Sequence, residues 1–391
     1  TPDYVPPDLT DELGGFYSAE DADSVPPEQA DEPPPSTPLR AGPHKMEGAF
    51  YIWREDEIRE VLGADAEGFI ARYGVRPDGN APFDPQNEFV RKNLLYTARP
   101  IEEIAATAGL SVEDVEAALR RGREALRRRR ASRPRPHLDD KVLTAWNGLM
   151  IAAFACAARV LPGATRFLND ARRAADFVRA QLWNPARGVL LRRYREGEAG
   201  IEGYAEDYAY LIFGLLQLFQ ADGDPRWLEW ARSLQERQNA LFWDPIEGGW
   251  FSTTGKDESV LLRLKEDYDG AEPAASSVSV LNLLTLAHLT PEPNAQSPES
   301  GAQSLDPNAQ IDLTLGNFAA RAAQSGRTVP MMLAALSTYH SGMPQVVIVG
   351  EPASEGTQSL LDIVRRHYLP TAIIVPVHSS NRGPLDRVLP W

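Results

Sequence analysis

Three polar clusters, each directly before an apolar run, carry the side chains of this chain that are best suited to chemistry. They read HLDDKVLTAWN at 137–147, EGYAEDY at 202–208 and KEDYDGAE at 265–272. Carboxylates exchange protons and accept hydrogen bonds from hydroxyl groups, and aromatic rings stack on the faces of sugar rings. The clusters therefore predict a polar site that binds a small, hydroxyl-rich ligand.

A plainer interpretation of each cluster is helix capping, because free N–H groups and the helix dipole favour carboxylates at a helix N-terminus. A cap needs one oxygen, however, and each cluster supplies several polar groups. The residues expected to move protons are His137, Asp140, Glu206, Asp207 and Glu272. Those expected to bind the ligand are Asp139, Lys141, Trp146, Asn147, Glu202, Tyr204, Tyr208, Trp250 and Asp269.

Two kinds of reaction fit these residues, and the sequence leaves both open. Two carboxylates, one acid and one base, suit glycoside hydrolysis. His137 beside carboxylates suits acid–base chemistry such as epimerisation, although a loop histidine that bonds a carbonyl is the alternative. The chain has six histidines, and a partner for His137 would have to be His44 or lie outside this sequence.

The elements that must position the clusters are helical. Nearly apolar runs predict buried inner helices near 140–161, 206–221, 273–289 and 329–340, and amphipathic runs predict outer helices near 166–182 and 226–240. Inner and outer helices alternate, which indicates stacked helical hairpins. The inner-helix starts recur every 66 residues, at Asp140, Glu206 and Glu272. In such a stack the inner helices run parallel, so the three clusters should converge on one rim.

The rest of the chain is expected to support this domain, which spans 1–342. Low-complexity segments near 25–45 and 291–311 predict disordered insertions. Residues 343–391 contain two β-branched runs around a helical pattern, which predicts a small β-α-β appendage. Ser111 and Asp114 predict the start of a helix that ends in arginines, and we expect those arginines to be solvated and ion-paired.

Composition excludes several classes of protein. The net charge of −15 argues against nucleic-acid binding, and no apolar run is long enough to span a membrane. The single cysteine, Cys156, lies in an apolar run and is expected in the core, which favours a reducing compartment such as the cytoplasm. No zinc-binding spacing and no nucleotide loop is present, so no cofactor is expected.

Four stretches resemble the spermatogenesis-associated protein 20 family over residues 11–380. They are GGFYSAEDADS, EGAFYIWREDEIREVLG, PHLDDKVLTAWNGLMI and EDYAYLI. The resemblance implies a thioredoxin-like domain followed by a six-hairpin (α/α) barrel similar to those of N-acylglucosamine epimerases and six-hairpin glycosidases. The thioredoxin-like domain and the first hairpins are not found in this sequence. The expected fold is therefore all-α, an incomplete (α/α)6 toroid with a small C-terminal α/β appendage.

The resemblance, joined to the clusters, implies a carbohydrate-binding or carbohydrate-modifying barrel within a larger protein. If it is an enzyme, the expected activity is that of a sugar epimerase or a glycoside hydrolase. The alternative is a non-catalytic partner domain that regulates a redox-related thioredoxin-like protein. The expected partners are a sugar or other small polar ligand, and a second copy bound at the cut edge of the barrel.

Overall fold

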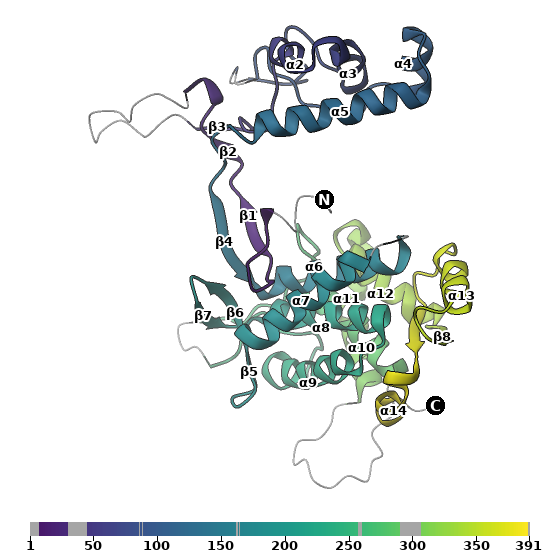
Figure 1. The fold of residues 1–391 in the computed structure, drawn as a ribbon. Helices are drawn as coiled ribbons and strands as arrows, with labels where there is room; N and C mark the ends of the chain where they lie inside the picture. Colours follow the sequence, from purple (N-terminus) through teal and green to yellow (C-terminus); the bar gives the residue numbers. More distant parts are fainter. Residues whose placement is uncertain are drawn as a thin grey trace. The chain divides into compact units, whose positions relative to one another are not determined.

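The computed structural model describes residues 8–29, 45–85, 87, 89–161, 163, 165–256, 260–289 and 306–389. Its contacts divide the chain into a first unit, Thr1–Ser18 with Asp140–Trp391, and a second unit, Ala19–Asp139. The chain is mostly helical (Figure 1), which confirms the expected fold class. In the described part of the chain no helix has the length and apolar character needed to cross a membrane. The domain boundary between 342 and 343 stays a prediction.

Helical hairpins build the first unit. The inner helices are α6 (Thr144–Val160), α8 (Ala205–Asp222), α10 (Ala275–Leu289) and α12 (Pro330–Ser341). The outer helices are α7 (Thr165–Phe177), extended by the π-helix η3 (Val178–Leu182), α9 (Pro225–Phe242) and α11 (Pro307–Ser325). Helix α8 packs against α6, α9 and α10, and α10 packs against α11 and α12. The expected alternation of inner and outer helices is confirmed.

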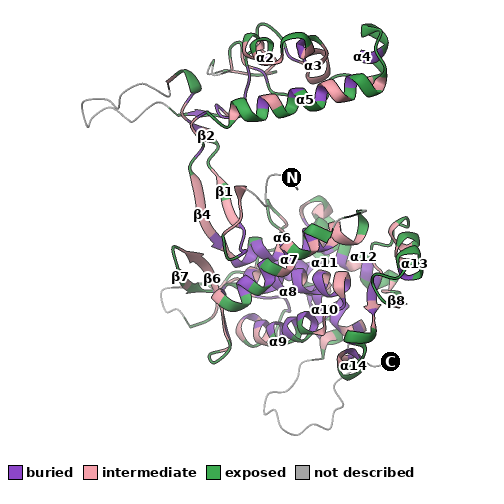
Figure 2. Cartoon of the chain, viewed as in Figure 1, coloured by how far each residue is buried: buried purple, intermediate pink, exposed green. Residues whose placement is uncertain are grey.

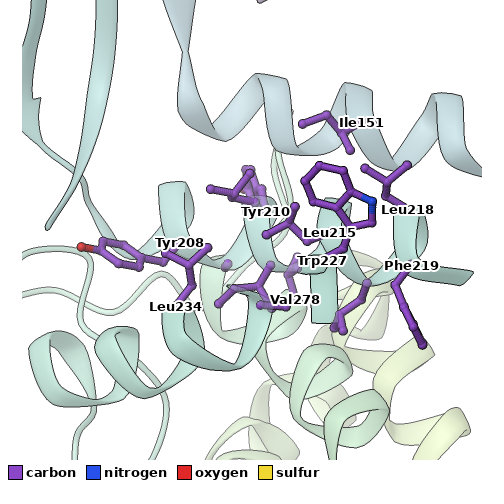
Figure 3. Close-up of a cluster of buried hydrophobic side chains, with 14 of the residues drawn as sticks. Ile151, Tyr208, Tyr210, Leu215, Leu218, Phe219, Trp227, Leu234 and Val278 are labelled. Atoms are coloured by element: carbon purple, nitrogen blue, oxygen red, sulfur yellow. The ribbon is translucent and has the colours of Figure 1, made fainter. Parts of the chain in front are cut away.

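Burial distinguishes the two kinds of helix (Figure 2). Helix α8 is buried on nearly every side, whereas α9 buries one face and exposes the other. Tyr208, Leu215 and Phe219 of α8 and Trp227 of α9 all belong to the main core (Figure 3), and each is at most 1% exposed. The apolar and amphipathic sequence patterns are therefore direct consequences of which helices line the core.

Two glycines allow α6 and α8 to approach closely. A Cβ on Gly148 would lie 2.4 Å from the backbone carbon of Tyr210, and a Cβ on Gly214 would lie 2.4 Å from the carbonyl oxygen of Gly148. No side chain fits at such distances, so glycine at both positions sets the spacing of the two helices.

A small sheet in this region corrects one expectation. Its strands are β1 (Tyr17–Glu20), β4 (Leu138–Leu143), β5 (Trp183–Asn184), β6 (Val189–Arg195) and β7 (Glu198–Glu202), in the order β1-β4-β6-β5 with β7 beside β6. The helix expected from about 140 starts at Thr144, because the residues before it form strand β4. There Val142 pairs with Tyr194, and the Thr144 hydroxyl donates to the Leu191 carbonyl at 2.6 Å.

The C-terminal segment forms the expected β-α-β arrangement. It consists of β8 (Gln345–Val349), α13 (Glu355–Arg365), β9 (Ile373–Val377) and a last helix, α14 (Ser379–Val388). Strands β8 and β9 pair in parallel. Strand β9 packs on α8, and Asn381 donates to the Gly223 carbonyl at 3.0 Å.

The second unit is a small helical assembly that was only partly expected. It contains α2 (Glu55–Leu62), α3 (Ala66–Tyr73), α4 (Ile101–Ala108), α5 (Val112–Arg130) and the paired strands β2 (Asp23–Ser24) and β3 (Met46–Glu47). Only α5 was predicted, and the Ser111 hydroxyl caps it by accepting from Asp114 N at 3.0 Å. Helices α2 to α4 have eight residues each, about two turns, which is too short a window to establish a helical period from sequence.

The expected insertions are only partly described. Residues 30–44 and 291–305 lie outside the described residues. The boundaries themselves need correction, because Pro27–Gln29 forms a 3-10 turn and α11 starts at Pro307. Asp306 accepts from Asn308 N at 2.9 Å, and a proline at the first helical position suits a helix start.

The contact between α6 and α8 predicts a large difference between two glycine-to-alanine substitutions. Gly148→Ala should lower the free energy of unfolding by about 1–3 kcal/mol, because the new methyl group overlaps α8. Gly316→Ala on α11, where nothing lies within 4 Å of a new Cβ, should raise it by up to about 1 kcal/mol through helix propensity. Urea unfolding measures both, and equal effects would show that the contact does not constrain the fold.

Candidate functional site

The starts of α6, α8 and α10 meet, as the sequence predicts. Trp146, in the first turn of α6, donates from Nε1 to Glu272 Oε1 at 2.7 Å, just before α10. The backbone N–H of Ala145 donates to Asp207 Oδ1 of α8 at 3.1 Å. Ala145 and Asp207 are 62 positions apart in the sequence, and Trp146 and Glu272 are 126 positions apart. We call this end of the inner helices the rim.

The rim carries three carboxylates that interact electrostatically: Glu206, Glu266 and Glu272. Partial desolvation, with the charges of Glu206 and Glu272, raises the pKa of Glu266. Burial, followed by the charges of Glu272, Glu206 and Glu266, raises the pKa of Tyr210, whose hydroxyl donates to the Pro273 carbonyl. In the described residues no lysine or arginine forms an ion pair with Glu266 or Glu272. Both carboxylates are exposed and available to a ligand.

Arg192 of strand β6 organises the α8 side of the rim. Its Nη1 donates to Glu206 Oε1 at 2.7 Å and to Asp207 Oδ2 at 2.9 Å. Its guanidinium carbon lies 4.6 Å from the centre of the Tyr204 ring, a cation–π contact. One arginine therefore fixes two carboxylates and one aromatic side chain.

Asp207 was predicted to carry a proton, and in the structure it also connects α6, β6 and the start of α8. It is fully buried and accepts hydrogen bonds from Ala145 N, Tyr204 N and Arg192. Burial raises the pKa of the Asp207 carboxyl to about 7, against the lowering effects of Arg192 and the Tyr204 N–H group. Asp207 has no surface for a ligand, so it acts on a ligand only through the groups that it holds.

Aromatic side chains at the rim divide into exposed and buried ones. Trp146 is 41% exposed and Tyr204 is 38% exposed, so both can stack on a ligand. The expectation that Tyr208 and Trp250 stack on a sugar is wrong for this conformation, because each is 1% exposed. The Tyr208 hydroxyl accepts from Leu190 N at 3.0 Å, and Trp250 Nε1 donates to Asn239 at 3.0 Å.

Two further predicted ligand-binding residues serve the fold instead. Asn147 is fully buried and exchanges hydrogen bonds with the backbone N–H and carbonyl of Phe16, at 2.8 and 3.0 Å. Asp269 accepts from Ala274 N and Met331 N, both at 2.8 Å, and so joins the starts of α10 and α12. Their hydrogen-bonding capacity is used by the backbone, which corrects the expectation that they contact a ligand.

The first cluster is spread over strand β4 rather than gathered at a helix start. Asp139, Asp140 and Lys141 lie on β4, and Asp140 forms an ion pair with Arg195 of β6 at 2.7 Å. The Lys141 carbonyl accepts from the Ser18 hydroxyl at 2.7 Å. Because β4 is extended, its side chains alternate between two faces and cannot all point to one site.

His137 and Glu202 also fall outside the set that meets at the rim. His137 is exposed and belongs to the second unit, where its carbonyl accepts from Asp21 N. Glu202 is exposed at the end of β7 and pairs with Arg187 at 2.7 Å. Of the five residues expected to move protons, the contacts and charges place Glu206, Asp207 and Glu272 together.

Sequence reasoning missed Glu266, Arg192 and Tyr210. Glu266 stands inside the cluster KEDYDGAE, so its position next to a named cluster was the available signal. Arg192 lies in strand β6, outside the clusters, and the β6–β7 hairpin brings it to α8. Within the described ranges no group of three or more His, Cys, Asp or Glu side chains is arranged to hold a metal ion.

The fold and the rim define a helical-hairpin protein with acidic and aromatic side chains at the N-terminal ends of its inner helices. No family model matches the chain. The human and mouse proteins named spermatogenesis-associated protein 20 are each 36% identical to it over 99% of this chain. A Caenorhabditis elegans protein described as uncharacterized is 31% identical over 96% of this chain.

Over nearly all of its length the chain is thus homologous to spermatogenesis-associated protein 20, which confirms the resemblance seen in its motifs. The chain spans about half the length of the curated relatives that it matches, 49% of the human protein and 48% of the mouse protein.

Solved structures give weaker similarities. A sugar epimerase from a ruminal bacterium has 16% identity and a TM-score of 0.33, covering 45% of this chain and 43% of that one. A D-mannose isomerase has 11% identity and a TM-score of 0.32, covering 86% of this chain and 68% of that one. Because both TM-scores are below 0.5, neither similarity is sufficient to assign a fold or a function to this chain.

The raised pKa of Asp207 predicts a pH dependence that Asp207→Asn removes. A pKa of about 7 in the folded state, above the ordinary 3.8, means that the folded protein binds the extra proton. The stabilising contribution of this proton is complete below pH 3.8 and is lost as the pH rises through 7. The stability of wild type minus that of the variant should therefore fall between about pH 4 and 7, by at most about 1.4 kcal/mol per pH unit.

Urea unfolding of both proteins at several pH values measures this difference. A difference that stays constant from pH 4 to 7 would show that Arg192 and the backbone N–H groups keep Asp207 ionised despite its burial.

Proposed function

We propose that the rim binds a carbohydrate. The observation that carries the proposal is the exposed Trp146 ring, whose Nε1–H is bonded to Glu272 while Glu272 shares its electrostatic field with Glu206 and Glu266. Sugars present hydroxyl donors and apolar C–H faces together, and carboxylates beside an exposed indole complement both. Tyr204, held by Arg192, supplies a second exposed ring at the same end.

For a carbohydrate-modifying reaction, the carboxylates supply the acid and base roles. Glu266, whose pKa is raised, suits the proton donor, because a carboxyl group must be neutral to donate. Glu206, which accepts a hydrogen bond from Arg192 Nη1 at 2.7 Å, is held in position for the base role. This division favours a glycoside hydrolase-like reaction over epimerisation by paired histidines. The described histidines other than His137 lie in α10, in α12, just after α13 and at the start of α14, and His44 lies outside the described residues.

The second candidate is the non-catalytic partner domain. It is favoured by the number of rim groups that already have partners in the fold. Asp207 and Asp269 accept backbone N–H groups, and Lys265 pairs with Asp244 at 2.7 Å. Under this alternative the rim is a structural network, and the protein's activity belongs to other parts of a longer chain.

A thermal-shift screen against mono- and oligosaccharides tests the carbohydrate proposal. We expect one class of sugar to raise the melting temperature, since a ligand that binds only the folded state stabilises it. Glu272→Gln should weaken binding by about tenfold, because it removes the charge and one of the two acceptor oxygens. Trp146→Phe should weaken it by a similar factor, because it removes the indole N–H group and part of the stacking surface.

The matched control is Glu229→Gln, at an exposed position on α9, which should leave sugar binding unchanged. A panel without any shift, obtained on a well-folded protein, would contradict the carbohydrate proposal and favour the partner domain.

A further inference from the structure

The second unit contains a cavity of about 420 Å³ that the proposed function does not use. One wall is the first turns of α2, another is the C-terminal end of α5, and the turn at Pro27 and the side chain of Lys92 complete the lining. All of its lining residues belong to the second unit. Its volume is in the range of small-molecule sites.

Trp53 and Arg133 form the most buried part of the lining. The Trp53 residue is 3% exposed, and the Arg133 guanidinium carbon lies 4.0 Å from the centre of the Trp53 ring. Arg133 Nη1 donates to the carbonyls of Phe50 and Ile52 at 2.9 and 2.7 Å, and Nη2 donates to Glu57 at 2.7 Å. These bonds hold the guanidinium in one orientation, which is the rigidity that a binding site needs.

The charges of the lining are balanced. Four basic and four acidic side chains surround the cavity. Glu57 pairs with both Arg133 and Arg129, at 2.7 and 3.5 Å, and Lys92 pairs with Glu28 at 3.4 Å. A ligand with a single net charge would be attracted by one half of the lining and repelled by the other, so it gains little from this arrangement.

One carboxylate of the lining has no ion-pair partner in the described part of the chain. The Glu60 carboxylate lines the cavity, is exposed and forms no ion pair. Arg133 Nε has no hydrogen-bond acceptor either, but it has almost no accessible surface, so a ligand does not reach it. Glu60 is therefore the group of the lining that is open to a cationic group of a ligand.

We propose that this cavity binds a zwitterion of the size of an amino acid or dipeptide. The ligand carboxylate pairs with the half-exposed Arg129, while the ligand ammonium group pairs with the exposed Glu60. Apolar parts of the ligand contact Ile52 and Ala49, which line the cavity and are at most 5% exposed. Because the lining carries equal numbers of acidic and basic side chains, a ligand must carry one positive and one negative group to bind.

Isothermal titration of the whole chain with three matched probes tests this requirement. The dipeptide Ala-Leu carries both charges, N-acetyl-Ala-Leu carries only the carboxylate and Ala-Leu-amide carries only the ammonium. Ala-Leu should bind at least about tenfold more tightly than either analogue, since each analogue loses one charge-assisted contact. Equal binding of N-acetyl-Ala-Leu would overturn the proposal in favour of a plain anion site.

Two variants locate the binding without disturbing the buried arginine. Glu60→Gln and Arg129→Gln should each weaken Ala-Leu binding by about tenfold. Glu113→Gln, at an exposed position near the other end of α5, is the control and should leave it unchanged. Absence of heat with all three probes on folded protein, or loss of binding in the control alone, would also overturn the proposal.

Discussion

The rest of the rim depends on the hydrogen bonds that the buried carboxylate of Asp207 accepts. Its two oxygens accept from the first turn of α6, from the backbone N–H of Tyr204 at the start of α8, and from Arg192 of strand β6. A charge in the core is tolerated only when it is paired and hydrogen-bonded, and these three donors meet that condition. By tying three elements to one atom group, Asp207 sets where Trp146, Glu206 and Tyr204 stand.

Around this joint the polar groups divide into those that build the rim and those that remain available. Asn147 and Asp269 are committed to backbone groups of distant segments, at Phe16, Ala274 and Met331. Glu266 and Glu272 have no cationic partner in the described residues, and Glu272 accepts a hydrogen bond from the exposed Trp146 indole. The buried polar groups therefore hold the fold rigidly, while the exposed Glu266 and Glu272 remain open to a ligand.

The two units use buried arginine and aspartate in opposite ways. In the first unit a buried carboxylate gathers donors, and in the second unit the buried guanidinium of Arg133 gathers acceptors from Phe50, Ile52 and Glu57. Each arrangement links a helix to segments that precede or follow it in sequence. Both also lie beside side chains without partners, which is where we place the two proposed ligands.

Much of the architecture was determined by the sequence by itself. The apolar runs and the outer amphipathic runs identified the hairpins, because helix burial imposes a periodicity that sequence displays directly. The expected 66-residue spacing of the helix starts was wrong, because α6 begins at Thr144, α8 at Ala205 and α10 at Ala275. The convergence of Trp146, Glu206, Asp207 and Glu272 followed from the parallel inner helices. The short helices α2 to α4 were missed, since each has only eight residues, fewer than are needed to establish a helical period from sequence.

Only the tertiary structure decided which polar residues face solvent and which serve the core. Tyr208 and Tyr204 are four positions apart in the same cluster, yet one is 1% exposed and the other 38%. Arg192 reaches Glu206 because β6 and β7 form a hairpin, and strand β4 replaced the expected helix start because β6 pairs with it. Such contacts join residues far apart in the chain, and their energies depend on distances that no local pattern encodes.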